Sequence, residues 1–173
     1  MATVHGIAVT KDSAIKLPVS AYFLPKGEGL LRMQGAFTSE VRNVLLACIE
    51  AVRAIEPYFD EVDSSKFATC NLNIVMETDV PVAGESYGLP LAMAIVSAML
   101  HKSIDTKTCF TGVIEPGGAI LNVEDIDRKR KHAARLGFKK LVLPSPQLDV
   151  FNTSIDQVPV DTLTAAITGH FWE

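Results

Sequence analysis

The sequence has little that would mark a secreted, metal-binding or membrane protein. Its 173 residues include three cysteines, and no segment has the roughly 18 consecutive apolar residues that a membrane-spanning helix needs. Cys48, Cys70 and Cys109 are odd in number, widely spaced and set among apolar residues, so we expect small core residues rather than disulfides or metal ligands. The four histidines also lack the spacing of metal ligands. We therefore predict no metal site and a reducing compartment.

The charge balance excludes other function classes. The chain has 16 basic and 20 acidic residues, a net charge of -4, which gives no general attraction to nucleic acid or to an anionic membrane. Its first 16 residues lack a basic stretch followed by a long apolar run, so we expect no secretion signal. We predict a single domain spanning residues 1–173, in the cytoplasm, with neither nucleic acid nor membrane as partner.

Apolar periodicity predicts an α/β fold of mixed sheets with packed helices. The first three strands are expected to be antiparallel, and Thr38 or Ser39 can cap a helix that Pro57 ends. Residues 89–100 are apolar on every side, which is typical of a helix buried in the centre of a domain. We expect the other strands and helices at residues 4–9, 14–23, 30–35, 70–77, 108–114, 119–123, 139–143 and 155–158 (strands), and 124–136 and 160–169 (helices).

A glycine-containing loop precedes the buried helix and includes Ser86 between Gly84, Glu85, Tyr87 and Gly88. Glycine lets the backbone turn sharply, and the start of the helix offers unpaired N–H groups at the positive end of its dipole. Such donors can stabilise the oxyanion that forms when a serine attacks a carbonyl, so the amides near Ser86 are candidates for an oxyanion hole. The ordinary alternative is a serine that caps the helix.

Lys129 is the candidate base. It lies on an apolar face of the helix predicted at residues 124–136, together with Ile126, Ala133 and Leu136. Burial lowers the pKa of a lysine from about 10.4 toward neutrality, and a neutral amine can take the proton of a serine hydroxyl. The alternative is a lysine that extends its ammonium group to water.

The other polar residues of this helix have ordinary explanations. Arg128, Lys131 and Arg135 are expected to be solvated charges, while Arg130 is intermediate. His132 follows Lys129 by three residues, so a pairing of Ser86 with His132 is a second conceivable geometry.

These segments together resemble the proteolytic domain of the ATP-dependent Lon proteases. The resemblance includes the separation of 43 positions between Ser86 and Lys129, and it extends over about 140 residues. It implies the Lon proteolytic fold, related to the second domain of ribosomal protein S5, and a catalytic dyad of Ser86 and Lys129 without a cofactor. It also implies that the Thr111 hydroxyl supports the lysine amine. The motifs are the segment from Gly84 to Gly88, Thr111-Gly112, Gly118, Leu121 and the helix carrying Lys129.

The resemblance implies a serine endopeptidase that hydrolyses peptide bonds in unfolded or short polypeptides. It also implies a homo-oligomer, a hexameric ring in this family. Nothing in the sequence matches G-x-x-x-x-G-K-[ST], so the chain carries no ATPase module of its own. An AAA+ ATPase would then be either a partner protein or a missing domain of a longer chain.

Four positions depart from the family pattern. Ala83 stands where many bacterial members have an acidic residue, and Glu85 is similar to archaeal-type members. Tyr87 replaces a small residue, and Asp125 replaces part of a paired glycine before the lysine helix. A second resemblance is to the Lon-like N-terminal domain of magnesium-chelatase-related, ComM-type proteins, which lacks the serine. The alternative function is therefore a catalytically inactive Lon-like domain that serves as an assembly or regulatory module of a larger ATPase system.

Overall fold

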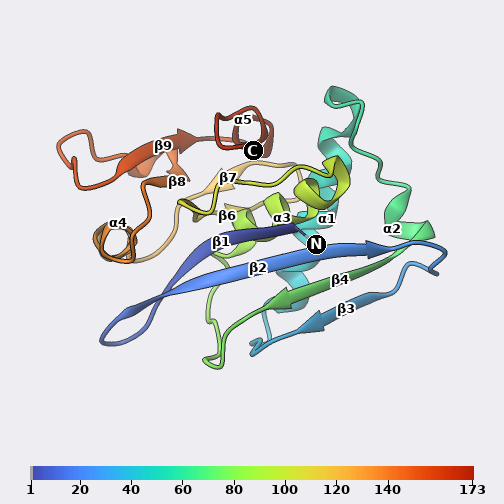
Figure 1. Ribbon diagram of the computed structural model, residues 1–173, viewed down its shortest axis with the longest axis horizontal. Coiled ribbons are helices and arrows are strands. Elements are labelled where there is room, and N and C mark those ends of the chain that lie inside the picture. The colour runs from blue at the N-terminus through green and yellow to red at the C-terminus, as the bar shows by residue number, and fades with distance from the viewer. Residues whose placement is uncertain (1) are drawn as a thin grey trace.

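A seven-stranded mixed sheet forms the framework of the molecule (Figure 1). The structure is a computed structural model that describes residues 2–173. Its strands are β1 (Ala2–Val9), β2 (Ala14–Leu24), β3 (Leu31–Gln34), β4 (Asn71–Met76), β5 (Thr108–Phe110), β6 (Val113–Ile114), β7 (Ile120–Leu121), β8 (Lys140–Pro144) and β9 (Asp156–Val160). Its helices are α1 (Val41–Ile55), α2 (Lys66–Thr69), α3 (Gly88–Leu100), α4 (Ile126–Arg135) and α5 (Leu163–Ile167), with 3-10 turns at Glu56–Tyr58 and Ser145–Gln147.

The strand order in the large sheet is β3-β4-β2-β1-β5-β8-β9, and β6 pairs with β7 alone. The hairpin of β1 and β2 is antiparallel, as predicted, with Val4 opposite Val19. The expectation that β3 extends this antiparallel run was wrong, because β4 lies between β2 and β3 and pairs with β3 in parallel. The helix α1 connects β3 to β4, and a helical crossover returns the chain in the same direction.

The strand predicted at residues 108–114 is interrupted. Thr111 and Gly112 leave the sheet between β5 and β6. The amide of Gly112 donates to the carbonyl of Ser86 in the loop before α3, and its carbonyl accepts from Leu89 N in the first turn of α3. A side chain at Gly112 would lie 2.8 Å from Ile120 Cγ2, so glycine permits this close approach. The interruption therefore follows from contacts with a segment distant in sequence.

The predicted cap of α1 was also wrong. The helix begins after Glu40 without a side-chain capping bond. The hydroxyl of Thr38 donates to the Glu40 carboxylate and to the carbonyl of Val82 instead. Thr38 thus ties the segment before α1 to the loop that leads to Ser86.

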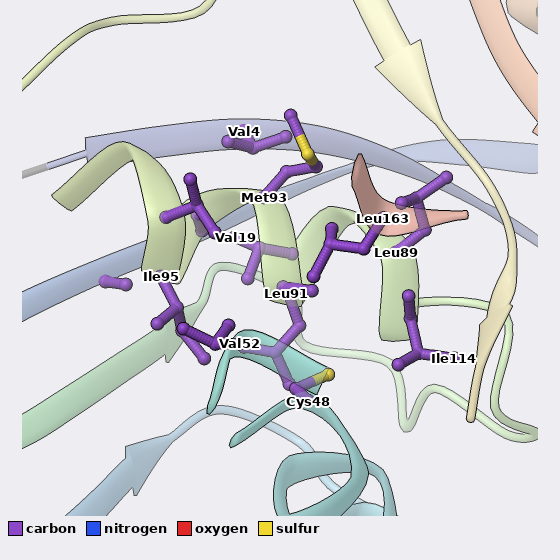
Figure 2. Close-up of a cluster of buried hydrophobic side chains, with 14 of the residues drawn as sticks. Val4, Val19, Cys48, Val52, Leu89, Leu91, Met93, Ile95, Ile114 and Leu163 are labelled. Atoms are coloured by element: carbon purple, nitrogen blue, oxygen red, sulfur yellow. The ribbon is translucent and has the colours of Figure 1, made fainter. Parts of the chain in front are cut away.

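The helix α3 is buried on all sides, as the sequence predicted, and it forms the centre of the main apolar cluster (Figure 2). The sheet covers one side of α3 and α1 covers another, so successive side chains of α3 meet different elements. Burial of this kind fixes the position of the helix and hence of its N-terminus. Its neighbours in Figure 2 include Val4 and Val19 from the sheet, Cys48 and Val52 from α1, and Leu163 from α5.

A second, smaller apolar cluster covers the other face of the sheet. Leu141 and Leu143 belong to it, whereas Val142 belongs to the main cluster, because alternate residues of a strand point to opposite faces. Ala133 of α4 packs in this second cluster. The helices α3 and α4 thus lie on opposite faces of the sheet.

The cysteines are all free thiols in the structure. Cys48 and Cys109 are buried, as predicted, whereas Cys70 is only half-buried. In the part of the chain that the structure describes, no helix is both long enough and apolar enough to cross a membrane.

We expect Leu91→Ala to lower the free energy of unfolding by about 2 to 5 kcal/mol, because it leaves a cavity in a core that cannot collapse. The matched control is Leu46→Ala on α1, since Leu46 is 44% exposed. That change should cost less than about 0.5 kcal/mol. Urea denaturation followed by circular dichroism measures both, and equal losses would contradict the central place of α3.

Candidate active site

The site lies where β1 and β5 separate. These strands pair only through His5 with Cys109 and Gly6 with Phe110, after which β1 continues and β5 ends. A cleft of about 650 Å³ opens beside the continuing part of β1. Through this opening, a residue of α4 reaches the N-terminus of α3 from the opposite face of the sheet. The cleft is lined by residues 7–11, 15, 17, 80–86, 113, 122–125 and 129.

Ser86 is held at the edge of this cleft by the backbone of its loop. Its carbonyl accepts a hydrogen bond of 3.0 Å from Gly112 N, and Gly84 turns the chain with a φ of +79°. Tyr87, the next residue, is 2% exposed and packs its ring in the main apolar cluster. The loop is therefore anchored on both sides of a half-buried serine.

Two of the amides proposed for an oxyanion hole are already used. Gly88 N donates to the carbonyl of Glu85, and Leu89 N donates to that of Gly112, both at 3.0 Å. The amides of Ser86 and Tyr87, by contrast, donate to no acceptor within residues 2–173. They are the free donors beside the serine hydroxyl, while the carboxylate of Glu85 is exposed.

The structure brings Ser86 and Lys129 together. The Nζ of Lys129 lies 2.9 Å from the Oγ of Ser86, within hydrogen-bond distance. Lys129 is 3% exposed, so its amine is largely removed from water. Burial lowers the pKa of Lys129 to about 8, although the carboxylates of Asp125 and Glu124 act in the opposite direction. A substantial fraction of the amine is thus neutral near physiological pH.

Asp125 fixes the start of the lysine helix. It adopts a left-handed conformation, with φ of +56°, at a position where the family resemblance implies glycine. Aspartate is among the few residues with a side chain that tolerate this region. Its carbonyl accepts the amide of Lys129 at 2.9 Å. The glycine therefore gives way to aspartate without losing the turn that orients Lys129.

The hydroxyl of Thr111 makes no hydrogen bond to the amine of Lys129, the contact that the resemblance implied. Thr111 is completely buried, and its amide donates to the carbonyl of Val142. Its hydroxyl has no hydrogen-bond partner among the described residues, Lys129 included. A supporting role for Thr111 stays a prediction.

The other residues of α4 differ from expectation in two respects: Arg130, expected to be intermediate, is buried, and Arg128 is not a solvated charge. Lys131 and Arg135 are exposed, as predicted, but Arg128 is half-buried and donates to the carbonyl of Thr10 at 2.6 Å. It ties the turn between β1 and β2, which forms one wall of the cleft, to α4. His132 makes no side-chain hydrogen bond within residues 2–173, and the described partner of the Ser86 hydroxyl is Lys129.

Sequence reasoning missed the walls of the cleft and the contacts of Arg128. Residues 7–11 and 122–125 are far apart in sequence and meet only through the tertiary fold. For the left-handed turn at Asp125 the sequence did contain a signal, because Asp125 stands at a position where the family resemblance implies glycine. No local pattern could have indicated that Arg128 contacts a turn 118 residues away.

The comparison with known proteins places the chain in the class of Lon-type proteolytic domains. More particularly, the chain belongs to the family of the Lon protease (S16) C-terminal proteolytic domain, because the model of that family matches residues 1–168. This confirms the family that the sequence motifs indicated, and the mixed α/β structure agrees with the fold expected for it.

Individual relatives agree with the family. The chain is 27% identical over 157 residues to the Lon protease of Clostridioides difficile strain 630, a match that covers 90% of this chain and 19% of the relative. It is 29% identical over 159 residues to the Lon protease of Methanosarcina barkeri, a match that covers 91% of this chain and 19% of the relative. The chain thus spans about a fifth of the length of these Lon proteases. It is also 34% identical over 79 residues to the DNA repair protein RadA of a Synechocystis strain, a match that covers 46% of this chain and 16% of the relative.

The buried amine makes folding stability depend on pH. The folded-state pKa of Lys129, about 8, lies below the ordinary lysine value of 10.5 that applies to the unfolded chain. Below pH 8 the lysine is protonated in both the folded and the unfolded state, so the full free-energy cost of burying a charged amine lowers stability. This cost disappears as the pH rises from 8 to 10.5, and the protein becomes more stable. We therefore expect Lys129→Met to raise the free energy of unfolding by roughly 1 to 3 kcal/mol at pH 7, and less at pH 10.

Urea denaturation at pH 7, 8.5 and 10 measures this difference. Lys131→Met on the exposed side of the same helix is the matched control, and it should change stability little at any of these pH values. A stability difference between Lys129→Met and the wild type that does not vary with pH would contradict a depressed pKa of Lys129.

Proposed function

We propose that the chain is a serine endopeptidase domain in which Ser86 is the nucleophile and Lys129 is the general base and then the general acid. The observation that carries this proposal is the 2.9 Å contact between Ser86 Oγ and Lys129 Nζ, in a lysine that is 3% exposed. A hydroxyl needs a nearby base to become nucleophilic, and a buried amine is neutral enough to accept its proton.

In the first half of the reaction, the neutral amine of Lys129 takes the proton of Ser86 while Oγ attacks the peptide carbonyl carbon. The carbonyl oxygen gains the electron pair and becomes an oxyanion. The unpaired amides of Ser86 and Tyr87 are suited to donate to it, assisted by the positive end of the α3 dipole. Collapse of this intermediate breaks the C–N bond, and the ammonium of Lys129 gives its proton to the leaving amine.

In the second half, water attacks the acyl group on Ser86. Lys129 is neutral again after the first half, so it takes a proton from that water. The second tetrahedral intermediate collapses with Ser86 as leaving group, which recovers its proton from Lys129. The peptide acid is released, and both side chains return to their starting states without a cofactor.

The cleft supports a polypeptide substrate that is unfolded or short. At about 650 Å³ it can hold a few residues of a chain but no folded domain. The end of β1 and residues 80–82 give it apolar walls, and Lys11, Glu85 and Glu124 add charges at its margin.

Assembly and energy supply belong to the same proposal. We infer a single domain that works as a homo-oligomer, such as a hexameric ring, with an AAA+ ATPase that is a separate protein or another part of a longer chain. The relatives named Lon protease are about five times as long as the matched region, which supports a further module. The proposed location is the cytoplasm.

A catalytically inactive Lon-like domain is the second candidate. The match over 46% of the chain to a protein named for DNA repair, and not as a protease, supports a role other than peptide cleavage. The departures at Glu85 and Tyr87, directly beside the serine, point the same way. The contact between Ser86 and Lys129 favours the peptidase, since an inactive scaffold has no need of a buried lysine against a serine.

We expect Ser86→Ala and Lys129→Ala each to reduce cleavage of an unfolded protein by at least about a thousandfold, because the nucleophile and its base act as a unit. Release of fluorescent fragments from a labelled unfolded protein measures the rate. Ser65→Ala and Lys131→Ala, both at exposed positions away from the cleft, are the matched controls and should retain activity. Wild-type protein that cleaves nothing would favour the inactive scaffold.

The same amine sets the pH dependence of cleavage. Lys129 acts as a base only when neutral, so kcat/KM should rise with pH and reach half its plateau near the pKa of about 8. Initial rates between pH 6 and 10 on a short fluorogenic peptide test this. A rate already at its plateau at pH 6.5 would show that another group is the base.

A further inference from the structure

Arg130, the residue after Lys129, is a buried charge. It is 2% exposed and heads the fully buried side chains ranked by size. Its Nε donates to Gln157 Oε1 at 3.0 Å, and its two terminal nitrogens donate to Asp127 Oδ1 at 2.7 Å and to the carbonyl of Gln147 at 2.6 Å. The one carboxylate among these partners belongs to an almost fully exposed side chain. Desolvation of a guanidinium is costly, so this arrangement is unlike ordinary apolar packing.

Apart from the bond of Arg128 to the carbonyl of Thr10, the first turns of α4 have few other restraints. Ala133 is the one apolar residue of α4 that is fully buried, and it lies in the second half of the helix. No side chain caps the N-terminus at Asp125. Ile126, the apolar residue nearest the start, is half-buried. Apolar packing and capping therefore give little control over the rotation and height of the turn that carries Lys129.

Two partners of Arg130, Gln147 and Gln157, lie outside α4, and both make further hydrogen bonds. Gln147 accepts from the backbone amide of Val123 at 2.9 Å and donates to its carbonyl at 2.8 Å, two residues before Asp125. Gln157 in β9 donates to the carbonyls of Asp149 and Asn152. Arg130 thus connects the start of α4 to β9 and to the loop after β8 through directional bonds.

We propose that Arg130 is a positioning residue that sets the rotation and height of α4, so that the amine of Lys129 meets the hydroxyl of Ser86. The inference rests on the proposed function and deepens it. The two side chains leave consecutive backbone positions, so any rotation of this turn moves both. The guanidinium provides three bonds at fixed angles, whereas an apolar side chain of similar volume would allow the turn to slide.

Two substitutions test this proposal. Arg130→Lys keeps the positive charge but loses the planar fork, and Arg130→Met keeps much of the volume without any donor. Both should lower kcat on a short peptide by about 10- to 100-fold, because small displacements of a catalytic group are costly. KM should change less than about twofold, since Arg130 does not line the cleft. An unchanged kcat in both variants would overturn the proposal.

A destabilised protein could also lose activity, so a control and a second readout are needed. Val52→Ala lowers stability in the main apolar cluster, remote from α4, and its kcat should stay close to that of the wild type. In Arg130→Lys the displaced amine gains water, so the pKa of Lys129 should rise from about 8 toward its ordinary value. Because Arg130→Lys keeps the positive charge next to Lys129, a higher pKa of Lys129 in this variant does not come from a lost charge repulsion.

Titration of the Lys129 ¹³Cε resonance by NMR reads this shift without any enzyme activity. A midpoint at least about half a pH unit higher in Arg130→Lys supports the proposal, and an unchanged midpoint overturns it.

Absence of cleavage by the wild type would refute the peptidase alone, while the titration would still decide the role of Arg130. If both Arg130 variants fail to fold, Gln157→Met removes one acceptor and should shift kcat and the midpoint in the same directions. An unshifted Gln157→Met would overturn the proposal.

Discussion

The arrangement depends on the burial of one lysine amine against one serine hydroxyl. Lys129 is 3% exposed, and the burial of its amine favours the neutral form and lowers the pKa of Lys129 to about 8. This unfavourable burial is tolerable only where the surrounding structure holds the group in place. The buried helix α3 and the bonds of Gly112 hold Ser86, while the left-handed turn at Asp125 directs the start of α4 toward it.

Three consecutive basic residues of α4 illustrate how the site is built. Arg128 bonds the turn between β1 and β2, Lys129 reaches Ser86 through the opening between β1 and β5, and Arg130 bonds the segments around β9. Successive residues of a helix point about 100° apart, so one turn contacts three parts of the fold. A short charged segment that could be taken for a solvated surface thereby connects the wall of the cleft, the base and the sheet.

The sequence allowed some of these features to be predicted for physical reasons. A helix that is apolar on every side must be buried, and α3 is buried. A lysine on an apolar helix face must be at least partly buried, and Lys129 is buried as well. The family followed from motifs along most of the chain. By contrast, the parallel pairing of β3 with β4, the break in the strand at Thr111 and the contacts of Arg128 all depend on segments far apart in sequence. Local periodicity carries no information about such contacts.

The most direct test of the account is whether Ser86 behaves as an activated nucleophile that depends on Lys129. A peptidyl boronic acid added to the full chain at pH 8.5 should give a tetrahedral ¹¹B resonance, as expected when an activated serine hydroxyl adds to boron. The account predicts this resonance in the wild type and in Lys131→Ala, its weakening as the pH falls below 8, and its loss in Ser86→Ala and Lys129→Ala. A wild-type protein that leaves the boron trigonal, or a Ser86→Ala variant that still forms the adduct, would contradict it.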